Sequence, residues 1–462
     1  MPDPLDAITP LDGRYAASTA PLRPYASEAA LMQARARIEI EYLIALAALD
    51  DIPLSLDSDE QTWLRGLYEE FDDEDANRIK AIEVEGDDSR PATNHDVKAV
   101  EYWIDDQLEG GDLEEAIPWV HFGLTSEDVN NLSYRWLLRS ACEEVLLPSL
   151  EELQEQLRDE ATTNRDVAML SRTHGQAASP TTYGKELAVV ANRLNNARHR
   201  LERSLDELEG KFGGATGTFA AHEVAEPAVD WVAFGRDFVT NLGFEYNPLT
   251  TQVNPNDDIA RVFDDLSGIA TILLDFDRDM WRYVSDGYLV QETEAGEVGS
   301  STMPHKVNPI DFENSEGNLK KAKSDLRFLS DTLPTSRLQR DLSDSTVHRT
   351  IGGSLGHWLL GVEKASTGLS KVAPAPDRMA ADLEEADEVL AEAIQTALRR
   401  IGDQDAYDRL KAATRGKRVR RSDFDELISE IREVDPALAD RLETLEPATY
   451  VGLAAELTDE LN

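Results

Sequence analysis

The sequence predicts an all-α protein built from long helices, and three observations lead to this prediction. Apolar side chains recur at helical spacing, with charged residues between them, in segments 184–210 and 258–290. Strand signals are few, and no regular alternation of strand and helix segments indicates a parallel sheet. Several periodic segments exceed the ~8–20 residues of a typical globular helix. Their apolar stripes therefore require neighbouring helices or subunits, as in a helix bundle.

Further helices are predicted around these two segments. Segment 127–160 carries an apolar stripe but contains Pro148, whose ring should kink or interrupt the helix. Another helix begins near Glu313 and runs towards Leu329. The run Gly213–Gly217 superficially resembles a phosphate-binding loop, but it lacks the Lys-Ser/Thr ending and any preceding strand. We interpret it as a turn that ends a helix.

Two acid- and turn-rich breaks divide the predicted helices. They lie near 105–118 and 366–378, and the second contains the run Ala-Pro-Ala-Pro-Asp. A chain of 462 residues is long enough for two or three domains. We therefore expect a helical head, a long central bundle and a helical tail, with the boundaries 1–115, 116–369 and 370–462.

The chain is strongly acidic, with 90 Asp and Glu residues against 46 Lys and Arg residues and a formal net charge of −44 at pH 7. Self-repulsion of this size destabilises a compact state at low salt and is relieved when salt screens it. The acids are scattered over the whole chain rather than collected in a tail. We therefore favour adaptation to a halophilic, high-salt cytoplasm over a negative partner-binding surface.

Composition also argues against several functional classes. A surface of this charge repels phosphates, which disfavours nucleic-acid binding. The single Cys142 rules out internal disulfides and fits a reducing compartment. The N-terminus has no charged-then-apolar pattern, and no apolar run approaches the ~20 residues that span a bilayer. We expect a soluble cytoplasmic protein with no membrane partner.

Segment 299–314, which reads Gly-Ser-Ser-Thr-Met-Pro-His-Lys-Val-Asn-Pro-Ile-Asp-Phe-Glu-Asn, is the most informative part of the chain. It combines the adjacent hydroxyls of Ser300 and Ser301 with the cation of Lys306 and the amide of Asn308. A loop of this composition can close over an anion, with the cation and the amide binding a carboxylate while a serine faces the carbon to be deprotonated. The alternative is a Ser-Gly turn followed by an amphipathic helix.

Two polar segments near the N-terminus are candidates for anion binding. The turn Asp-Gly-Arg-Tyr presents the guanidinium of Arg14 and the phenol of Tyr15, which suit a phosphate, although such turns are also common as solvated loops. Asn94, His95 and Asp96 stand at the opening of a helix, where they either cap it or bind an anion.

Two further polar segments follow in the predicted bundle. Thr125 and Ser126 stand at the mouth of a long helix, where hydroxyls and free backbone N–H groups either cap the helix or hold a carboxylate or phosphate. His174 lies in a loop rich in hydrogen-bonding groups, ahead of a helix start that we place at Ser179–Thr181. Such a histidine is suited to proton transfer near neutral pH, although a lone histidine is more often structural.

Other chemistries find no support in the sequence. The eight His residues show no His-x3-His or Cys-His spacing, so we expect no metal site. No Gly-x-Ser-x-Gly elbow surrounds the candidate serines, which argues against a hydrolase. No dinucleotide-binding fingerprint follows a strand.

Segment 299–314 closely resembles the mobile catalytic loop of the fumarate-releasing lyases, the fumarase and aspartase superfamily, whose pattern is G-S-S-x-M-P-x-K-x-N. Within this superfamily, the chain resembles the adenylosuccinate lyase family of enteric bacteria, and the resemblance extends from residue 9 to the region around Tyr450. One departure is Ala177, where that family usually has proline. The segments that carry the closer resemblance are Asp12–Tyr15, Thr93–Tyr102, Thr125–Asp128, Ser171–Gln176, Thr250–Gln252, Met303–Lys306 and Gln339–Thr346.

The resemblance implies a β-elimination in purine nucleotide biosynthesis. Family members release fumarate from adenylosuccinate to give AMP, and from succinyl-aminoimidazole-carboxamide ribotide to give the carboxamide ribotide. Each reaction removes a weakly acidic proton beside a carboxylate and protonates the departing nitrogen. The intermediate aci-carboxylate requires positive charge and hydrogen-bond donors around it.

By the same resemblance, Ser300 is the general base, with Ser301 as the alternative because sequence does not orient adjacent hydroxyls. His174 is the general acid at the leaving nitrogen. The implied substrate-binding residues are Thr125, Ser126, Ser301, Lys306 and Asn308 around the carboxylate, Arg14, Tyr15, Arg340, Ser345 and Arg349 around the phosphate, Gln252 near the ribose or succinyl part, and Asn94, His95 and Asp96 as binding or orienting groups.

The resemblance also implies a homotetramer whose core is the shared long-helix bundle. Each active site then takes residues from three chains, with no metal and no organic cofactor. The nearest alternative is another lyase of the superfamily, such as argininosuccinate lyase. A non-enzymatic structural relative is the alternative from another class, but a scaffold has no need of His174, Ser300, Lys306 and Asn308 together.

Overall fold

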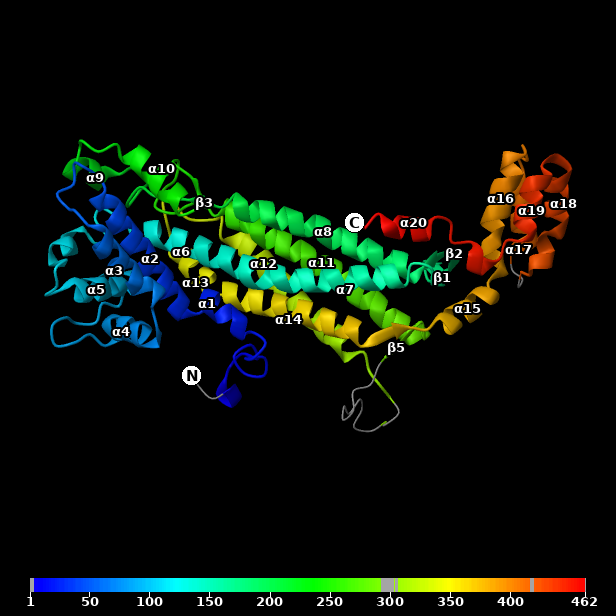
Figure 1. Cartoon of the computed structure of the whole chain (residues 1–462), viewed down its shortest axis with the longest axis horizontal. Coiled ribbons are helices and arrows are strands. Elements are labelled where there is room, and N and C mark those ends of the chain that lie inside the picture. Colours follow the sequence, from blue (N-terminus) through cyan, green and yellow to red (C-terminus); the bar gives the residue numbers. More distant parts are fainter. Residues whose placement is uncertain (1–3, 292–302, 304–305, 416–418, 462) are drawn as a thin grey trace. The chain divides into compact units, whose positions relative to one another are not determined.

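The computed structural model describes residues 4–291, 303, 306–415 and 419–461. Helices make up most of these residues and the strands are short (Figure 1), so the predicted all-α class is confirmed. In chain order the α-helices are α1 Arg23–Ala26, α2 Glu28–Ala47, α3 Ser58–Glu69, α4 Asp73–Val84, α5 Asp96–Leu108, α6 Ser126–Ala141, α7 Leu147–Thr163, α8 Tyr183–Asp206, α9 Ala220–Ala225, α10 Trp231–Asn241, α11 Asp257–Asp286, α12 Ile310–Thr332, α13 Ser343–His348, α14 Ile351–Ser370, α15 Pro376–Glu384, α16 Ala391–Arg400, α17 Ala406–Thr414, α18 Asp425–Val434, α19 Pro436–Glu443 and α20 Ala454–Asp459.

The long helices predicted from apolar periodicity are present with slightly different ends. Segment 258–290 forms α11, segment 184–210 forms α8, and the helix expected from Glu313 is α12. A helix of this length is stable in a protein mainly because its apolar face is buried. The predicted apolar stripe of α11 is buried at every position, namely Val262, Phe263, Leu266, Ile269, Leu273, Phe276 and Met280.

The predicted interruption near Pro148 is confirmed. Helix α6 ends at Ala141, a single π-helical turn occupies Cys142–Leu146, and α7 begins at Leu147 with Pro148 as its second residue. Proline has no N–H to donate, and this missing donor is tolerated in the first turn of a helix. The backbone stays helical through Cys142 and Leu147, so the interruption is a π-helical turn between two α-helical segments.

Three two-stranded sheets accompany the helices within the described residues. The first contains the hairpin that carries His174, and its register shifts between Met169 and Ser171. Residues Ser179–Thr181 belong to its second strand, so the helix start predicted there is wrong, because a β-bulge accommodates Pro180, which cannot donate to the ladder. The pairs are β1 Ala168–Thr173 with β2 Gln176–Thr182 (antiparallel), β3 Glu209–Gly210 with β4 Glu245–Tyr246 (parallel), and β5 Leu289–Gln291 with β6 Val372–Pro374 (antiparallel).

The glycine-rich run Gly213–Gly217 does not end a helix, and that interpretation is also wrong. Helix α8 ends at Asp206, and the chain passes through β3 before it reaches the turn. The turn contains Gly214 and Gly217 with φ of 75° and 72°, a conformation that glycine adopts without strain.

The chain divides into two compact units, which we describe separately. Unit 1 consists of 1–150, 197–271 and 317–361, and unit 2 of 151–196, 272–316 and 362–462. The three-domain division expected from the sequence stays a prediction.

In unit 1, helix α2 packs against α3, α5 and α6, and α4 packs against α5 (Figure 1, blue to cyan). Aromatic rings fill part of its core, where Tyr42 lies 5.3 Å from Phe212 between ring centroids. A buried two-pronged ion pair joins α6 to α11, with Nε and Nη2 of Arg135 each 2.7 Å from an oxygen of Asp258. Unit 1 therefore combines an apolar core with fully buried charge pairs.

In unit 2, strand β1 packs against α15. Helices α16, α18 and α19 pack around a hydrophobic core (Figure 1, orange to red). That core includes Leu398, Phe424 and Ile431, which are buried. Apolar burial of this kind is enough to hold the short C-terminal helices together.

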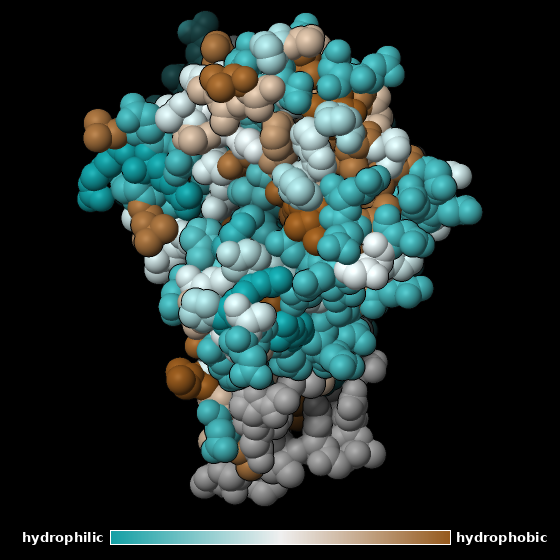
Figure 2. All heavy atoms as spheres, turned by 90° about the vertical axis from the view of Figure 1, so that its left-hand side faces the viewer, coloured by the Kyte–Doolittle hydropathy of each residue, from teal (hydrophilic) through white to brown (hydrophobic). Residues whose placement is uncertain are grey.

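The face of the molecule in Figure 2 is largely hydrophilic, with hydrophobic residues scattered over it. No helix within the described ranges combines the length and the apolar character that a membrane span requires.

Candidate functional site

The start of α5 brings three of the predicted site residues to one end of a helix. Asn94 precedes it with a left-handed backbone (φ 51°), and His95 caps it by accepting a hydrogen bond at Nδ1 from the N–H of Lys98 at 3.2 Å. The His95 side chain remains half exposed. Asp96, the first helical residue, accepts a bond at Oδ1 from the N–H of Val97 at 2.9 Å. The capping interpretation is thus confirmed, and it leaves an exposed imidazole beside a carboxylate.

Asp96 is also the meeting point of two guanidinium groups. Its Oδ2 accepts a bond from Nη2 of Arg35 at 2.8 Å and another from Nη2 of Arg349 at 2.8 Å. Burial acts to raise the pKa of Asp96, but the charge and hydrogen bond of Arg35, helped by Arg349, outweigh it and hold that pKa below its usual value. Asp96 is therefore an ionised anchor for Arg349, one of the predicted phosphate-binding residues.

The start of α6 carries Thr125 and Ser126. Thr125 is the N-cap, and its backbone N–H donates to Oδ2 of Asp128 at 2.9 Å. Ser126 is the first helical residue and, like Thr125, is half-buried. The structural interpretation placed the N-cap at Ser126, and the structure places it one residue earlier, at Thr125. Both hydroxyl residues lie at the positive end of the helix dipole.

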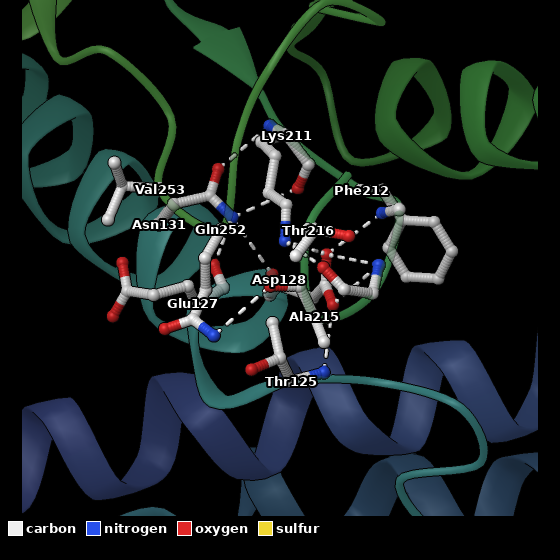
Figure 3. Close-up of polar contacts among 12 residues, drawn as sticks. Thr125, Glu127, Asp128, Asn131, Lys211, Phe212, Ala215, Thr216, Gln252 and Val253 are labelled. Atoms are coloured by element: carbon white, nitrogen blue, oxygen red, sulfur yellow. Dashed lines mark hydrogen bonds and ion pairs between the residues drawn. The ribbon is translucent and has the colours of Figure 1, made fainter. Parts of the chain in front are cut away.

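A fully buried ion pair lies directly behind this helix start (Figure 3). Nζ of Lys211 is 2.7 Å from Oδ1 of Asp128, and neither side chain is exposed. The same carboxylate accepts backbone bonds from Gly213 at 2.9 Å and from Gly214 at 3.0 Å, while Lys211 donates to the carbonyl of Gly214 at 2.9 Å. The glycine-rich turn is therefore a structural clasp that wraps around Asp128.

Replacing Lys211 by methionine is expected to lower the free energy of unfolding by about 3–5 kcal/mol, because the substitution leaves the Asp128 carboxylate buried without its counter-charge. The midpoint of urea unfolding, at fixed protein and potassium chloride concentrations, measures the loss. Arg193→Met, which removes the exposed pair between Arg193 and Asp275, is the matched control and should cost less than about 1 kcal/mol. Equal losses for both variants would contradict this account of the clasp.

Gln252 and Arg340, both predicted to contact the substrate, lie beside this clasp. The amide of Gln252 donates to the carbonyl of Ala215 at 3.1 Å and accepts a bond from Nη1 of Arg340 at 3.4 Å. Nη2 of Arg340 lies 3.0 Å from Oε1 of Glu127 in α6. Figure 3 shows Gln252 beside Asn131 and Glu127. The turn, α6 and the segment after α12 are thus connected through these polar side chains.

Three other predicted residues of unit 1 lie outside these contacts among the described residues. The Arg14 guanidinium lies 6.0 Å from the ring centroid of Tyr15, and Arg14 is exposed. Ser345 lies in α13, and its N–H donates to the carboxylate of Asp344 at 2.7 Å. The structure therefore joins Asp96, Gln252, Arg340 and Arg349 into one network and leaves these three apart from it.

His121 lies shortly before Thr125 and was not predicted to act in the site. Its Nδ1 lies 2.6 Å from Oε1 of Glu39, its Nε2 lies 3.8 Å from Oε1 of Glu101, and its backbone is left-handed (φ 55°). Burial acts to lower its pKa, but the charge and hydrogen bond of Glu39 and the charge of Glu101 raise the pKa of His121 to about 9. The imidazole is therefore cationic at neutral pH and fixes the chain just before Thr125.

In unit 2, His174 occupies the tip of the β1–β2 hairpin rather than an irregular loop. Thr173 pairs with Gln176, and the two residues between them, His174 and Gly175, have φ of 53° and 74°. Two consecutive left-handed residues are typical of a type I′ hairpin turn. The turn leaves the His174 side chain exposed. Ala177, where the family usually has proline, pairs with Arg172 inside the hairpin.

Side chains of unit 2 fix the base of this hairpin. Nη2 of Arg172 lies 3.6 Å from Asp382, whose other contacts include the Tyr288 hydroxyl at 3.0 Å. Ser179 donates to the carboxylate of Glu392, which also accepts a bond from the Tyr450 hydroxyl at 3.1 Å. The hairpin that presents the imidazole of His174 is therefore held in place by side-chain contacts on both of its strands.

Lys306 and Asn308 lie in the irregular segment that leads into α12. The N–H of Lys306 donates to the carbonyl of Met303 at 3.0 Å, and the Lys306 side chain is exposed. The carbonyl of Asn308 accepts a bond from Ile310 at 2.8 Å. The predicted base Ser300 and its alternative Ser301 lie outside the described residues.

The sequence interpretation missed the buried partners of the site residues, namely Arg35, Asp128, Asn130 and Lys211. Asp128 was quoted only as part of a helix start, where its favourable position near the helix dipole already explained it. Arg35 and Lys211 stand in ordinary helical or turn surroundings, and nothing local marks them as buried. A charged residue on the apolar side of a periodic segment is the one available signal.

Comparison with known proteins gives two family matches. Residues 13–323 match the family model described as Lyase, and residues 336–451 match the one described as Adenylosuccinate lyase C-terminal. The chain is 44% identical over 461 residues to the adenylosuccinate lyase of Escherichia coli strain K12, with 99% of each chain covered. It is 44% identical to that of Haemophilus influenzae, with 99% of each covered, and 43% identical to that of Dictyostelium discoideum, with 97% of each covered.

Two solved structures share the fold. The 3-carboxy-cis,cis-muconate lactonizing enzyme of Pseudomonas putida matches with a TM-score of 0.72 and 23% identity, covering 95% of each chain. The fumarate lyase of Mesorhizobium sp. BNC1 matches with a TM-score of 0.70 and 19% identity, covering 95% of this chain and 96% of that one.

Proposed function

We propose that this chain, which belongs to the adenylosuccinate lyase family and is therefore a carbon–nitrogen lyase, releases fumarate from adenylosuccinate by β-elimination. The observation that carries the function is the identity of 44% over 99% of the chain to an adenylosuccinate lyase. The substrate is accordingly a nucleotide that carries a succinyl group on nitrogen. The residue roles, the assembly and the second substrate described below are proposals.

The reaction is a β-elimination in which one C–H bond and one C–N bond break. A base takes the proton from the succinyl carbon beside a carboxylate, and the electron pair of that bond forms the double bond of fumarate. The C–N pair moves to the nitrogen, which an acid protonates. We assign the base to Ser300 and the acid to His174, and Ser301 is the alternative base. The exposed position of His174 on a supported hairpin turn suits a group that must reach a substrate.

A serine hydroxyl acts as a base only when its surroundings lower its pKa, which requires positive charge and exclusion of water. Lys306, close to Ser300 in sequence, supplies such a charge. We propose that Lys306 and Asn308 bind the carboxylate next to the reacting carbon, together with Thr125 and Ser126 at the start of α6. Donors at the carboxylate stabilise the dianionic aci form more than the substrate, which lowers the barrier.

The phosphate of the nucleotide is assigned to Arg14, Tyr15, Arg340, Ser345 and Arg349. Support comes from the geometry of unit 1, where carboxylates hold the guanidinium groups of Arg340 and Arg349 from one side. Planar guanidinium groups offer several donors at once and suit a phosphate better than a lysine does. Gln252, bonded to Arg340, is placed near the ribose or succinyl part. Asn94, His95 and Asp96 complete this side as binding and orienting groups.

We propose a homotetramer whose active sites combine residues of three chains. Helices α8, α11 and α12 are longer than typical globular helices, and such helices commonly pack against other subunits. Leu249 and Leu338, close in sequence to Gln252 and Arg340, are 87% and 89% exposed. Large exposed apolar side chains beside a polar site are typical of a surface that another chain covers.

The proposed working environment is a salt-rich cytoplasm. The net charge of −44 and the largely hydrophilic face in Figure 2 support it, because mobile cations screen repulsion between surface carboxylates. Activity and folding should therefore both require high salt.

A competition assay tests the proposal that one site serves both nucleotides. Fumarate should form from adenylosuccinate and from succinyl-aminoimidazole-carboxamide ribotide, and each nucleotide should inhibit cleavage of the other competitively, because both present the same phosphate and succinyl groups. The inhibition constant of each should equal its KM as an alternative substrate. Cleavage of adenylosuccinate alone, or inhibition that is not competitive, would remove the second substrate from the proposal.

A further inference from the structure

One continuous chain of hydrogen bonds joins the two arginines that carry the proposed phosphate site. It begins at Arg349, which donates to Oδ2 of Asp96, and the same oxygen accepts a bond from Nη2 of Arg35. Nε of Arg35 donates to Oδ1 of Asn130 at 2.9 Å, and Nδ2 of Asn130 donates to Oε1 of Glu127 at 3.0 Å. That glutamate oxygen also lies 3.0 Å from Nη2 of Arg340.

The middle of this chain is buried and its two ends are more open. Arg35 is 3% exposed, and Asn130 and Glu127 are each 7% exposed, whereas the side chain of Arg349 is 44% exposed. Burying an arginine and a glutamate is costly unless every charge finds partners. Because Arg35 is enclosed, it is not itself placed to bind a ligand. A buried arginine whose Nε and Nη2 both donate to other side chains indicates a positioning role.

Asn130 is the one uncharged side chain between the carboxylates of Asp96 and Glu127, and its amide determines the direction of the hydrogen bonds on either side of it. Its amide accepts a bond from Arg35 on one side and donates to Glu127 on the other. Aspartate could accept but not donate, and leucine could do neither. The amide is therefore required for both ends of the chain to be satisfied at once.

The donor from Asn130 also affects the charge of Glu127. Burial raises the pKa of this glutamate, while the charge of Arg340 and the hydrogen bond from Asn130 act against that rise. Without Asn130 the carboxylate of Glu127 loses a hydrogen bond that favours its ionised form, and Arg340 faces a weaker partner.

We propose that Arg35, Asn130 and Glu127 are positioning residues, which orient the guanidinium groups of Arg340 and Arg349 towards the phosphate of the nucleotide from two sides of one buried hydrogen-bond chain. This inference rests on the proposed placement of the phosphate. A guanidinium held by a carboxylate on one edge presents its remaining donors in a fixed direction, and less rotational freedom is lost when the phosphate binds. The series of hydrogen bonds couples Arg340 to Arg349, although the two arginines do not contact the same carboxylate.

The test uses Asn130→Asp in the full-length protein at fixed molar potassium chloride. The substitution keeps the size of the side chain and the acceptor for Arg35, removes the donor to Glu127, and places a second carboxylate beside it. We expect KM for adenylosuccinate and the inhibition constant of AMP to rise about tenfold, which corresponds to ~1.4 kcal/mol. The kcat should change less than twofold, and the inhibition constant of fumarate, which has no phosphate, should stay unchanged.

Asn77→Asp is the matched control, because Asn77 is exposed on α4 and its amide bonds only to the backbone carbonyl of Asp73 among the described residues. This variant adds the same charge and should leave all four constants unchanged. If Asn130→Asp does not fold, Arg35→Lys replaces it: the ammonium keeps the charge but does not span Asn130 and Asp96 together. The same selective rise for AMP is expected.

Three outcomes decide the matter. Unchanged AMP inhibition in the folded Asn130→Asp variant would overturn the positioning role. An equal weakening of AMP and fumarate would also overturn it, since that result indicates general damage to the fold. Arg340→Ala and Arg349→Ala distinguish a failure of the proposed function: if neither weakens AMP, the phosphate is bound elsewhere and the placement on which this inference rests is wrong.

Discussion

Ser300→Ala is expected to lower kcat on adenylosuccinate by about 10²–10⁴-fold, the range typical of a lost general base. The proton that leaves is only weakly acidic, so its removal depends on the ionised hydroxyl that we assign to Ser300. KM should change little, because the substrate is held mainly through its phosphate and carboxylates. Initial rates of fumarate release, measured in molar potassium chloride, give both constants.

Ser301→Ala is the matched control for this prediction, since it removes an adjacent hydroxyl of the same kind. It should raise KM with a smaller effect on kcat. A reversed pattern would move the base to Ser301, and near-normal turnover in both variants would exclude a serine base.

Sedimentation equilibrium of each variant should give the mass of four 51.3 kDa chains. A monomer or dimer with full activity would contradict the proposed shared sites.

His174→Asn is expected to have the second large effect, again a fall in kcat of about 10²–10⁴-fold, because the departing nitrogen loses its proton donor. Asparagine is the informative replacement. The backbone of His174 is left-handed (φ 53°), and asparagine tolerates this conformation better than most residues, so the hairpin turn should persist. The variant thus removes the imidazole without removing its support.

His199→Asn provides the matched control, since His199 is exposed on α8 and its imidazole forms a hydrogen bond with Glu202. Its kcat should equal that of the unmodified protein. A His174→Asn variant with unchanged kcat would show that another group protonates the nitrogen. A fall in kcat accompanied by a lower urea midpoint would indicate a damaged hairpin instead.

The helices could be predicted from sequence because each depends on a local pattern. The stripe from Val262 to Met280 repeats with the period of a helix, and burial of one face stabilises that arrangement wherever the neighbouring helices come from. Pro148 could be predicted to interrupt a helix because its effect depends on its own ring. These elements required no knowledge of tertiary contacts.

The hairpin of His174 was missed because its strands are short and carry few β-branched residues. Its turn combines histidine and glycine, whereas the common signals for a two-residue hairpin are Asn-Gly and Asp-Gly. The error at Ser179–Thr181 followed from the same segment, because a Ser-Pro-Thr run resembles a helix start in isolation.

The buried partners of the site were beyond sequence reasoning because they depend on distant contacts. Arg35 of α2 meets Asn130 of α6, and Lys211, which follows β3 much later in the chain, meets Asp128 of the same helix. Side chains that could be quoted in family motifs, such as Arg340 and Thr125, were named from the sequence. What holds them in place became visible only in the folded chain.

The most direct test of the central claim is the change in ultraviolet absorbance when the purified protein meets adenylosuccinate over a series of potassium chloride concentrations. The account predicts AMP and fumarate in equal amounts, with a rate that rises towards molar salt as screening relieves the charge of −44. Absence of turnover at every salt concentration, from a folded protein, would contradict it.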